Sequence, residues 1–146
     1  LQPRSVRRTK APESDFYHIT AARTAKRLAD EGIAVTIGAH GQREGLASHW
    51  EIWGFAQGGM SPVEALKTAT TASARKLGMS ADIGSLEPGK LADLVILDAN
   101  PLEDIYRSDE VNMVMLNGRL YEASTLNEVV TGDRKTRPFF WQTEGK

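Results

Sequence analysis

The chain has 146 residues, of which 40% are hydrophobic and 25% are charged, and its formal net charge is −1. This length suits one domain, and this composition is ordinary for a globular protein rather than for a low-complexity or disordered one. The chain has no cysteine, which excludes disulfides and cysteine-based zinc sites, and it has no apolar run near the ~20 residues that a membrane helix needs.

Charge is unevenly distributed along the chain. Residues 80–133 carry eleven acidic and three basic side chains, whereas the remaining residues carry eight acidic and fifteen basic ones. Four of those bases lie in the first ten positions, with no aromatic residue interleaved. We therefore interpret residues 1–15 as a basic loop or disordered end, and expect neither nucleic acid nor a membrane as a partner. The first residue is Leu, with no signal-peptide pattern after it, so we expect an excerpt from something longer.

Residues 16–79 are predicted to be α/β. Small apolar residues at a spacing of three and four predict a helix over 20–31, and the β-branched run that follows predicts a short strand over 33–37. A helix followed directly by a strand is half of a βα repeat. The Gly-rich, polar residues 38–45 then lie at the carboxyl end of that strand, where parallel α/β architectures bind ligands.

Two capping boxes predict the helices that come next. Residues 48–51, Ser-His-Trp-Glu, form the first box, and we expect the apolar stripe with Trp50 and Trp53 to pack in the core. Residues 61–64, Ser-Pro-Val-Glu, form the second box, with Pro at the first helical position. Its helix is predicted to run to Leu77, so that the two helices form a pair.

Residues 83–98 read as a hairpin in the core. Glu-Pro-Gly-Lys at 87–90 predicts a type II turn, because Pro presets φ at the second position and Gly accepts a positive φ at the third. The continuous apolar run Leu-Val-Ile-Leu at 94–97 is typical of a strand that is buried on both faces.

The end of the chain contains a second hairpin signal. Residues 111–116 predict a strand, and Asn117-Gly118 predicts a tight turn to a partner strand at 119–122. Residues 124–128 suggest one short helical turn. Residues 134–146 form a tail, whose apolar segment at 138–141 we expect to dock against the rest of the chain.

Several segments resemble the amidohydrolase superfamily. Residues 83–98, Ile-Gly-Ser-Leu-Glu-Pro-Gly-Lys-Leu-Ala-Asp-Leu-Val-Ile-Leu-Asp, closely resemble its C-terminal signature. Residues 61–78 resemble the helix before that signature, and 111–118 resemble the strand and turn after it. Because the resemblance runs in unbroken order over 16–123, the chain looks like a metal-dependent hydrolase of the imidazolonepropionase and prolidase-like type.

The resemblance implies a particular architecture. In this family a (β/α)8 barrel carries one or two divalent metal ions, and a small β-sandwich is built from both termini. Residues 16–79 would be the last βα portion of the barrel, with 33–37 as its eighth strand, and 80–133 would be the C-terminal strands of the sandwich. The implied function is the C-terminal portion of a metal-dependent hydrolase, with zinc as the expected metal, acting on a non-peptide or dipeptide-like C–N bond.

The same resemblance identifies candidate site residues. The family's metal ligands are a His-x-His pair on the first strand, a Lys or Glu on the fourth, His on the fifth and sixth, and an Asp after the eighth. This chain has no His-x-His, and only the last position falls within it, where Gly-Ala-His ending at His40 replaces the usual Gly-Thr-Asp. His40 is thus a candidate metal ligand or acid/base in the intact enzyme, or else a loop histidine bonded to backbone. Gln42 and Arg43 are candidate substrate contacts, or else part of a solvated loop.

Other polar residues suggest structural roles. We expect His49 to lie in the first turn of its helix, and Asp93 and Asp98 to be strand-end acids rather than a catalytic pair. His18 has no partner that the sequence identifies.

A single ligand cannot form the set of three or four that zinc requires, so we expect no tightly bound metal and no hydrolysis from this chain alone. The alternative is a non-catalytic, β-rich module for oligomerisation or partner binding, because half of a sandwich leaves strand edges and an apolar face open. The expected partner is a missing N-terminal barrel segment or another copy of the chain in a homo-oligomer.

Residues 38–42 and 49–51 also resemble exported proteins in which a Tol-type β-propeller precedes the amidohydrolase part. That subgroup implies a periplasmic or exported location, and without it we expect a cytoplasmic one.

Overall fold

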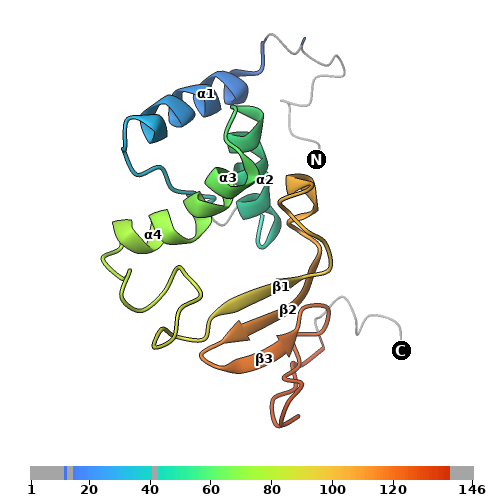
Figure 1. The fold of residues 1–146 in the computed structure, drawn as a ribbon. Helices are drawn as coiled ribbons and strands as arrows, with labels where there is room; N and C mark the ends of the chain where they lie inside the picture. Colours follow the sequence, from blue (N-terminus) through green and yellow to red (C-terminus); the bar gives the residue numbers. More distant parts are fainter. Residues whose placement is uncertain (1–11, 13–14, 41–42, 139–146) are drawn as a thin grey trace.

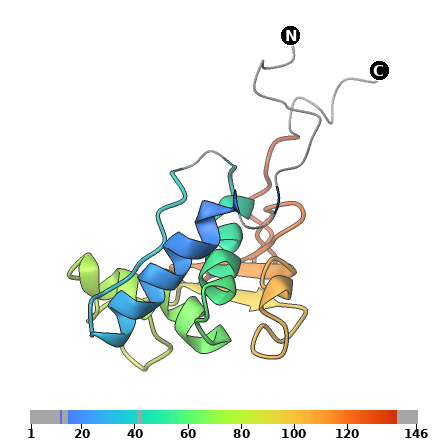
Figure 2. The same ribbon diagram turned by 90° about the horizontal axis from the view of Figure 1, so that it is seen from above.

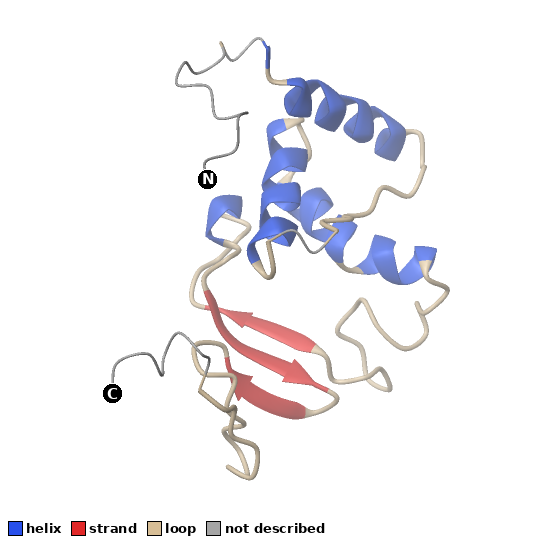
Figure 3. Cartoon of the chain, turned by 180° about the vertical axis from the view of Figure 1, so that it is seen from behind, coloured by secondary structure: helices blue, strands red, loops and turns tan. Residues whose placement is uncertain are grey.

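The computed structural model describes residues 12, 15–40 and 43–138, in which helices come first and a small antiparallel sheet follows (Figure 1). We call residues 15–79 the helical part and residues 80–138 the sheet part. Figure 3 shows the two parts from behind, with the helices gathered at one end and the strands at the other. The elements are α1 (Tyr17–Asp30), α2 (Leu46–Gln57), α3 (Pro62–Ala69), α4 (Thr71–Lys76), β1 (Leu94–Leu97), η2 (Ile105–Arg107), β2 (Val111–Leu116) and β3 (Arg119–Glu122).

The main hydrophobic core lies in the helical part, where α1 packs against α2 and α2 packs against α3 (Figure 2). Its buried members are Ile52, Met60, Ala65 and Ile105. Ile105 belongs to η2, so the short helical turn of the sheet part closes the core of the helical part. No helix in the described ranges is both long and apolar enough to cross a bilayer.

The predicted capping box at 61–64 is confirmed. Ser61 Oγ accepts a hydrogen bond from the Glu64 N–H at 3.3 Å, and Glu64 Oε2 accepts one from the Ser61 N–H at 2.7 Å. This second bond holds the pKa of Glu64 below its usual value. Pro62 occupies the first helical position, as expected. The helix is shorter than predicted, because Thr70 takes φ −125° and ψ −98° and separates α3 from α4.

The predicted box at 48–51 is wrong. Helix α2 already begins at Leu46, after Gly45 with φ 75°, so Ser48 lies inside the helix. The backbone starts this helix without a side-chain cap, since the Ala47 N–H donates to the Arg43 carbonyl at 2.9 Å.

The predicted strand at 33–37 is also not observed. These residues are extended but carry no strand ladder, and the sheet order β1-β2-β3 does not include them. They are bonded at their ends, by the Ile33 N–H to Leu28 O at 3.0 Å and the Ile37 N–H to Thr68 O at 3.3 Å. Val35 packs on the core. A strand needs a neighbouring strand for its backbone groups, and the described residues place none beside this segment.

The second hairpin is confirmed. Strand β2 pairs with β1 on one side and β3 on the other, both antiparallel, so that Val114 lies opposite both Val95 and Tyr121. Asn117 and Gly118 take φ values of 48° and 76°, as the two central residues of a type I′ turn require. The coarse prediction of α/β with a small antiparallel sheet is therefore right.

The predicted hairpin over 83–98 is only half right. The turn at 87–90 forms, with the Lys90 N–H donating to Glu87 O at 3.3 Å and Gly89 at φ 96°. No strand precedes it, however, and β1 pairs instead with the later β2. Within the described residues β1 is not buried on both faces, because Val95 is 60% exposed and Ile96 is 41% exposed.

The outer edge of β3 is covered by the chain that follows it. The Glu122 N–H donates to Asn127 O and the Val129 N–H donates to Leu120 O, both at 3.0 Å. Glu128, which is only 4% exposed, then holds the next loop through its carboxylate. The Thr131 hydroxyl and N–H and the backbone N–H groups of residues 130 and 132 donate to that carboxylate, and these bonds lower the pKa of Glu128 to about 2.

The short helical turn suggested for 124–128 is a non-helical turn over 123–125. Residues 139–141 of the predicted apolar tail lie outside the described residues.

Candidate functional site

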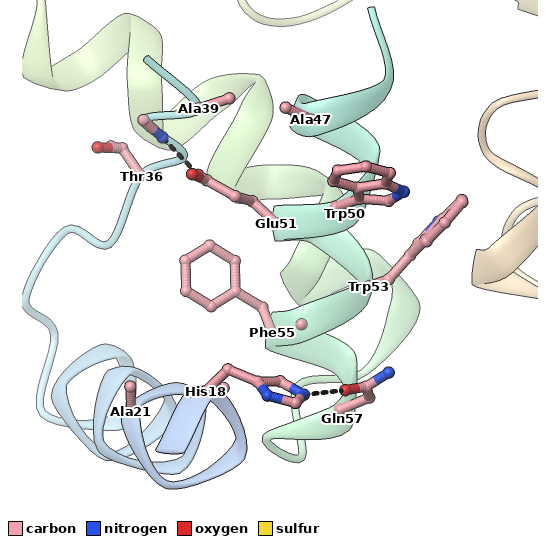
Figure 4. A pocket seen from close by; sticks show the side chains of 13 residues that line it. His18, Ala21, Thr36, Ala39, Ala47, Trp50, Glu51, Trp53, Phe55 and Gln57 are labelled. Carbon is pink, nitrogen blue, oxygen red and sulfur yellow. Dashed lines mark hydrogen bonds between the residues drawn. The ribbon is translucent and has the colours of Figure 1, made fainter. Parts of the chain in front are cut away.

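A cavity of about 810 Å³ lies between α1, α2 and the extended segment before His40 (Figure 4). Helix α2 contributes the aromatic side chains of Trp50, Trp53 and Phe55, and α1 contributes the small side chains of Ala21 and Ala22. The small residues leave the space, and the aromatic rings make most of its wall apolar. This composition is typical of a ligand cavity or of a surface that another polypeptide segment covers.

Two hydrogen bonds join the elements that form the wall of this cavity. Glu51 Oε2 accepts a bond from the Gly38 N–H at 2.5 Å, which ties α2 to the backbone two residues before His40. His18 Nε2 lies 3.1 Å from Gln57 Oε1, and this contact joins α1 to the end of α2. Figure 4 shows the two contacts at opposite ends of the cavity.

The residues predicted as a site are not gathered at this cavity. His40 is exposed and takes φ 56°, and it does not line the cavity, although Gly38 and Ala39 before it do. Arg43 is exposed, and its carbonyl accepts the bond that starts α2. Gln42 lies outside the described residues.

The described residues do not fit a catalytic metal. No three His, Asp or Glu side chains come together anywhere in residues 12, 15–40 and 43–138. His40 alone cannot supply the three or four ligands of a zinc site. Any metal centre of the intact protein would therefore need donors from other residues.

The sequence-based expectations for the two tryptophans have different outcomes. Trp53 packs against the core cluster, as expected. Trp50 is 47% exposed and lies on the cavity wall, so the expectation that it packs in the core is wrong. The reason is that α2 is covered by α1 on one side only, and the cavity takes up the space beside Trp50.

The expected structural roles of the other polar residues agree with the contacts that they make. His49 is the fourth residue of α2, and its Nδ1 lies 3.1 Å from Ser108 Oγ. Asp93 accepts a bond from the Asn117 N–H at 2.6 Å, and Asp98 accepts one from the Asn112 side chain at 2.7 Å. Asp98 thus holds one end of β1 to β2, and Asp93 holds the other end to the turn after β2.

Some cavity residues and contacts have no signal in the sequence. His18 and Gln57 are 39 positions apart, and the Glu51 carboxylate meets a backbone N–H thirteen positions away. Ser108, which is 2% exposed, accepts a hydrogen bond from the Trp53 indole N–H at 2.9 Å across 55 positions. These contacts depend on how helices and loops pack, which no local pattern encodes.

Comparison with known proteins places the chain in a family. The model of the amidohydrolase family matches residues 7–121, and the chain therefore belongs to that family. This match confirms the resemblance found in the sequence. Imidazolonepropionase of Shouchella clausii (strain KSM-K16) is 32% identical over an alignment of 149 positions. The alignment covers 90% of this chain and 33% of that protein.

Solved structures agree with this assignment. A Xaa-Pro dipeptidase with methionine bound in its active site matches with a TM-score of 0.63 and 32% identity, over 70% of this chain and 25% of that one. A prolidase complexed with N-methylphosphonate-L-proline matches with a TM-score of 0.60 and 31% identity, over 69% of this chain and 26% of that one. The chain thus spans a third or less of the length of these relatives.

Proposed function

We propose that this chain is the C-terminal portion of a metal-dependent amidohydrolase that hydrolyses a C–N bond in a non-peptide or dipeptide-like substrate. The observation that carries the proposal is the match to the Xaa-Pro dipeptidase, at 32% identity over a quarter of that enzyme. The prolidase with its bound phosphonate of proline supports a dipeptide-like substrate. The imidazolonepropionase relative supports a non-peptide one.

The metal in this proposal is a divalent ion, zinc, held mainly by residues outside the described part of the chain. The described residues bring no three ligands together, so no catalytic step is assigned to them. Their role is to position the loop that begins at Gly38. Glu51 holds the Gly38 N–H, and His40 follows as the candidate ligand or acid/base of the intact enzyme. Gln42 and Arg43 are the proposed substrate contacts.

The isolated chain tests one half of the proposal. We expect far less than one zinc per chain by elemental analysis, and no hydrolysis of Xaa-Pro dipeptides above the buffer rate. Stoichiometric zinc that is lost in His40→Ala but kept in His18→Ala would contradict this expectation.

The protein translated from the complete reading frame tests the other half. There, His40→Ala is expected to lower kcat/KM by at least about 100-fold, as is typical when a group that takes part in proton transfer is removed. His49→Ala is the matched control, because His49 contacts Ser108 in the fold and lies outside the cavity lining. An unchanged kcat/KM in His40→Ala would remove His40 from the site.

A second candidate function is a non-catalytic module for partner binding or oligomerisation. The observation that favours it is the exposure of Val95 and Ile96 on β1 and of Leu116 on β2. The partner would be a missing N-terminal barrel segment or another copy of the chain. Light scattering distinguishes these, because only a second copy gives a dimer or larger assembly of the pure chain.

The location follows the subgroup to which the whole protein belongs. We propose a periplasmic or exported protein if a β-propeller precedes this portion in the reading frame, and a cytoplasmic one otherwise. Cell fractionation with an antibody against the chain tests this.

A further inference from the structure

The turn between β2 and β3 contains a chemically reactive pair of residues, Asn117 and Gly118. Of the chain's asparagines, only Asn117 precedes a glycine. Because glycine has no Cβ, its nitrogen can approach the side-chain carbonyl carbon of the asparagine more closely than the nitrogen of a bulkier residue can. That approach is the first step in the loss of the side-chain amide as ammonia.

The side chain of Asn117 is available for this reaction. It is exposed, and no hydrogen bond to its amide group occurs within residues 12, 15–40 and 43–138. By contrast, the side-chain amides of Asn112 and Asn127 both take part in hydrogen bonds, at 2.7 Å and 2.8 Å. Asn100 precedes a proline, whose nitrogen has no hydrogen to lose.

The backbone of the same turn opposes the reaction. Ring closure requires the Gly118 nitrogen to swing toward Asn117 Cγ, by rotation about the Asn117 Cα–C bond. A type I′ turn fixes this rotation at a ψ of about 30°, which directs the nitrogen away from the side chain. Two hydrogen bonds hold the turn closed. The Gly118 N–H donates to the Ala92 carbonyl at 3.0 Å, and the Asn117 N–H donates to Asp93 Oδ1 at 2.6 Å.

We propose that Asn117 is a site of spontaneous deamidation, and that the bonds from the turn to Ala92 and Asp93 restrain the reaction until the turn opens. The Gly118 nitrogen loses its proton to water or hydroxide and bonds to Asn117 Cγ, and the Cγ–Nδ2 bond breaks to release ammonia. Water then opens the succinimide, which leaves aspartate or isoaspartate at position 117. Every protein group in this reaction belongs to the chain itself, and the proposal does not depend on the hydrolase function.

The modification would loosen one end of the sheet. Either product places a carboxylate close to that of Asp93, and like charges at this distance repel each other. Isoaspartate also adds a methylene group to the main chain, which a two-residue turn of fixed register does not accommodate. The bonds that tie the start of β1 to the turn would then be lost, and the change is not reversed by closing the turn again.

The direct test follows ammonia loss by mass spectrometry of tryptic peptides from the full chain, kept in mildly alkaline buffer with and without urea. Cleavage after Arg107 and Arg119 gives one peptide that contains both Asn112 and Asn117, so Asn112 is an internal control. Loss at Asn117 is expected to be at least about tenfold faster in urea, where the turn is open. Equal rates in the two conditions, or a rate in urea no higher at Asn117 than at Asn112, would overturn the proposal.

Three variants separate what restrains the reaction from what drives it. Asp93→Ala removes the acceptor of the Asn117 N–H and should speed the loss in buffer about three- to tenfold, which is the effect of one hydrogen bond on the opening of the turn. Asp93→Asn keeps an acceptor oxygen and should stay close to the wild-type rate. Gly118→Ala should slow the loss in urea, because its Cβ crowds the attacking nitrogen.

The same variants can contradict the proposal. In urea both Asp93 variants should match the wild type, since no turn remains to be restrained. A rate for Asp93→Asn as high as that for Asp93→Ala in buffer would show that the bond to Asp93 does not restrain the turn. An unchanged rate for Gly118→Ala in urea would contradict attack by the Gly118 nitrogen. Circular dichroism checks folding, and the wild type in buffer and in urea still decides the matter if Asp93→Ala is unfolded.

Discussion

The two extended apolar segments of the molecule, residues 33–37 and β1, are held in place by different interactions. Strand β1 is bonded along one side to β2, whereas residues 33–37 have backbone bonds only near their ends and are held by side chains packed on the helical core. Both segments are short and apolar. The difference shows that an extended run becomes a strand only where another segment offers its backbone groups. Side-chain packing alone holds such a run in place without making it a strand.

It follows that the helical part depends on close packing, and the sheet part depends on strand pairing and turns. Substitutions that remove packing should therefore affect the helical part most.

The largest expected effect is from Ile52→Ala, which empties a position in the core. It should lower the free energy of unfolding by about 2–5 kcal/mol, measured by urea titration of the helical circular dichroism signal. Leu77→Ala, at an exposed position just after α4, is the control and should change it by no more than about 0.5 kcal/mol. Equal effects of the two changes would mean that the helices are not held by this core.

Gly58→Ala should have the next largest effect. A Cβ at this position would lie 2.4 Å from the carbonyl carbon of Ala22, so α1 would have to move away from the end of α2. We expect a loss of about 1–3 kcal/mol in the free energy of unfolding. Gly54→Ala, in the interior of the same helix and with nothing within 4 Å of the added Cβ, should instead gain up to about 1 kcal/mol. A gain in both variants would contradict the close approach of α1.

Ser61→Ala should cost about 1 kcal/mol, because it removes the hydroxyl that caps α3. Ser48→Ala is the matched comparison, since Ser48 lies inside α2 and caps nothing. It should be neutral or slightly stabilising, because Ala has the higher helix propensity. Thermal unfolding of the two variants side by side measures the difference.

The smallest expected effect concerns the sheet part, and it appears only when the pH falls well below neutral. The pKa of Glu128 is lowered from 4.5 to about 2, mainly by the Thr131 hydroxyl. Its ionised form therefore contributes stability that is fully present above pH 4.5 and is lost as the pH falls toward 2. The melting temperature of the wild type should fall across this window, and that of Glu128→Gln should fall less. Parallel curves for the two proteins would contradict the bonds assigned to Glu128.

The features that were predicted correctly from the sequence are local ones, although the local capping box at 48–51 did not form. The cap at Ser61, the turn at Asn117-Gly118 and the turn at 87–90 each depend on residues within four positions of one another, and all three form. The strand at 33–37 and the burial of β1 depend on partners far along the chain or beyond the described residues, and both predictions were wrong.

The candidate site likewise combines a local feature that could be predicted with distant contacts that could not. The position of His40 directly after an extended segment could be predicted, because the segment and the Gly-rich loop are adjacent in the sequence. The cavity beside it could not, because its wall combines α1, α2 and the extended segment through contacts such as the bond from Gly38 to Glu51.

The hydrogen bond from Trp53 to Ser108 gives the molecule an optical reporter. The indole of Trp53 is half-buried and bonded to a residue of the sheet part, whereas Trp50 is 47% exposed. With Trp50 and Trp141 replaced by Phe, the fluorescence of Trp53 would shift to longer wavelength when the sheet part separates from the helices. The emission spectrum would then report the docking of the two parts for as long as the circular dichroism signal shows that the helices remain folded.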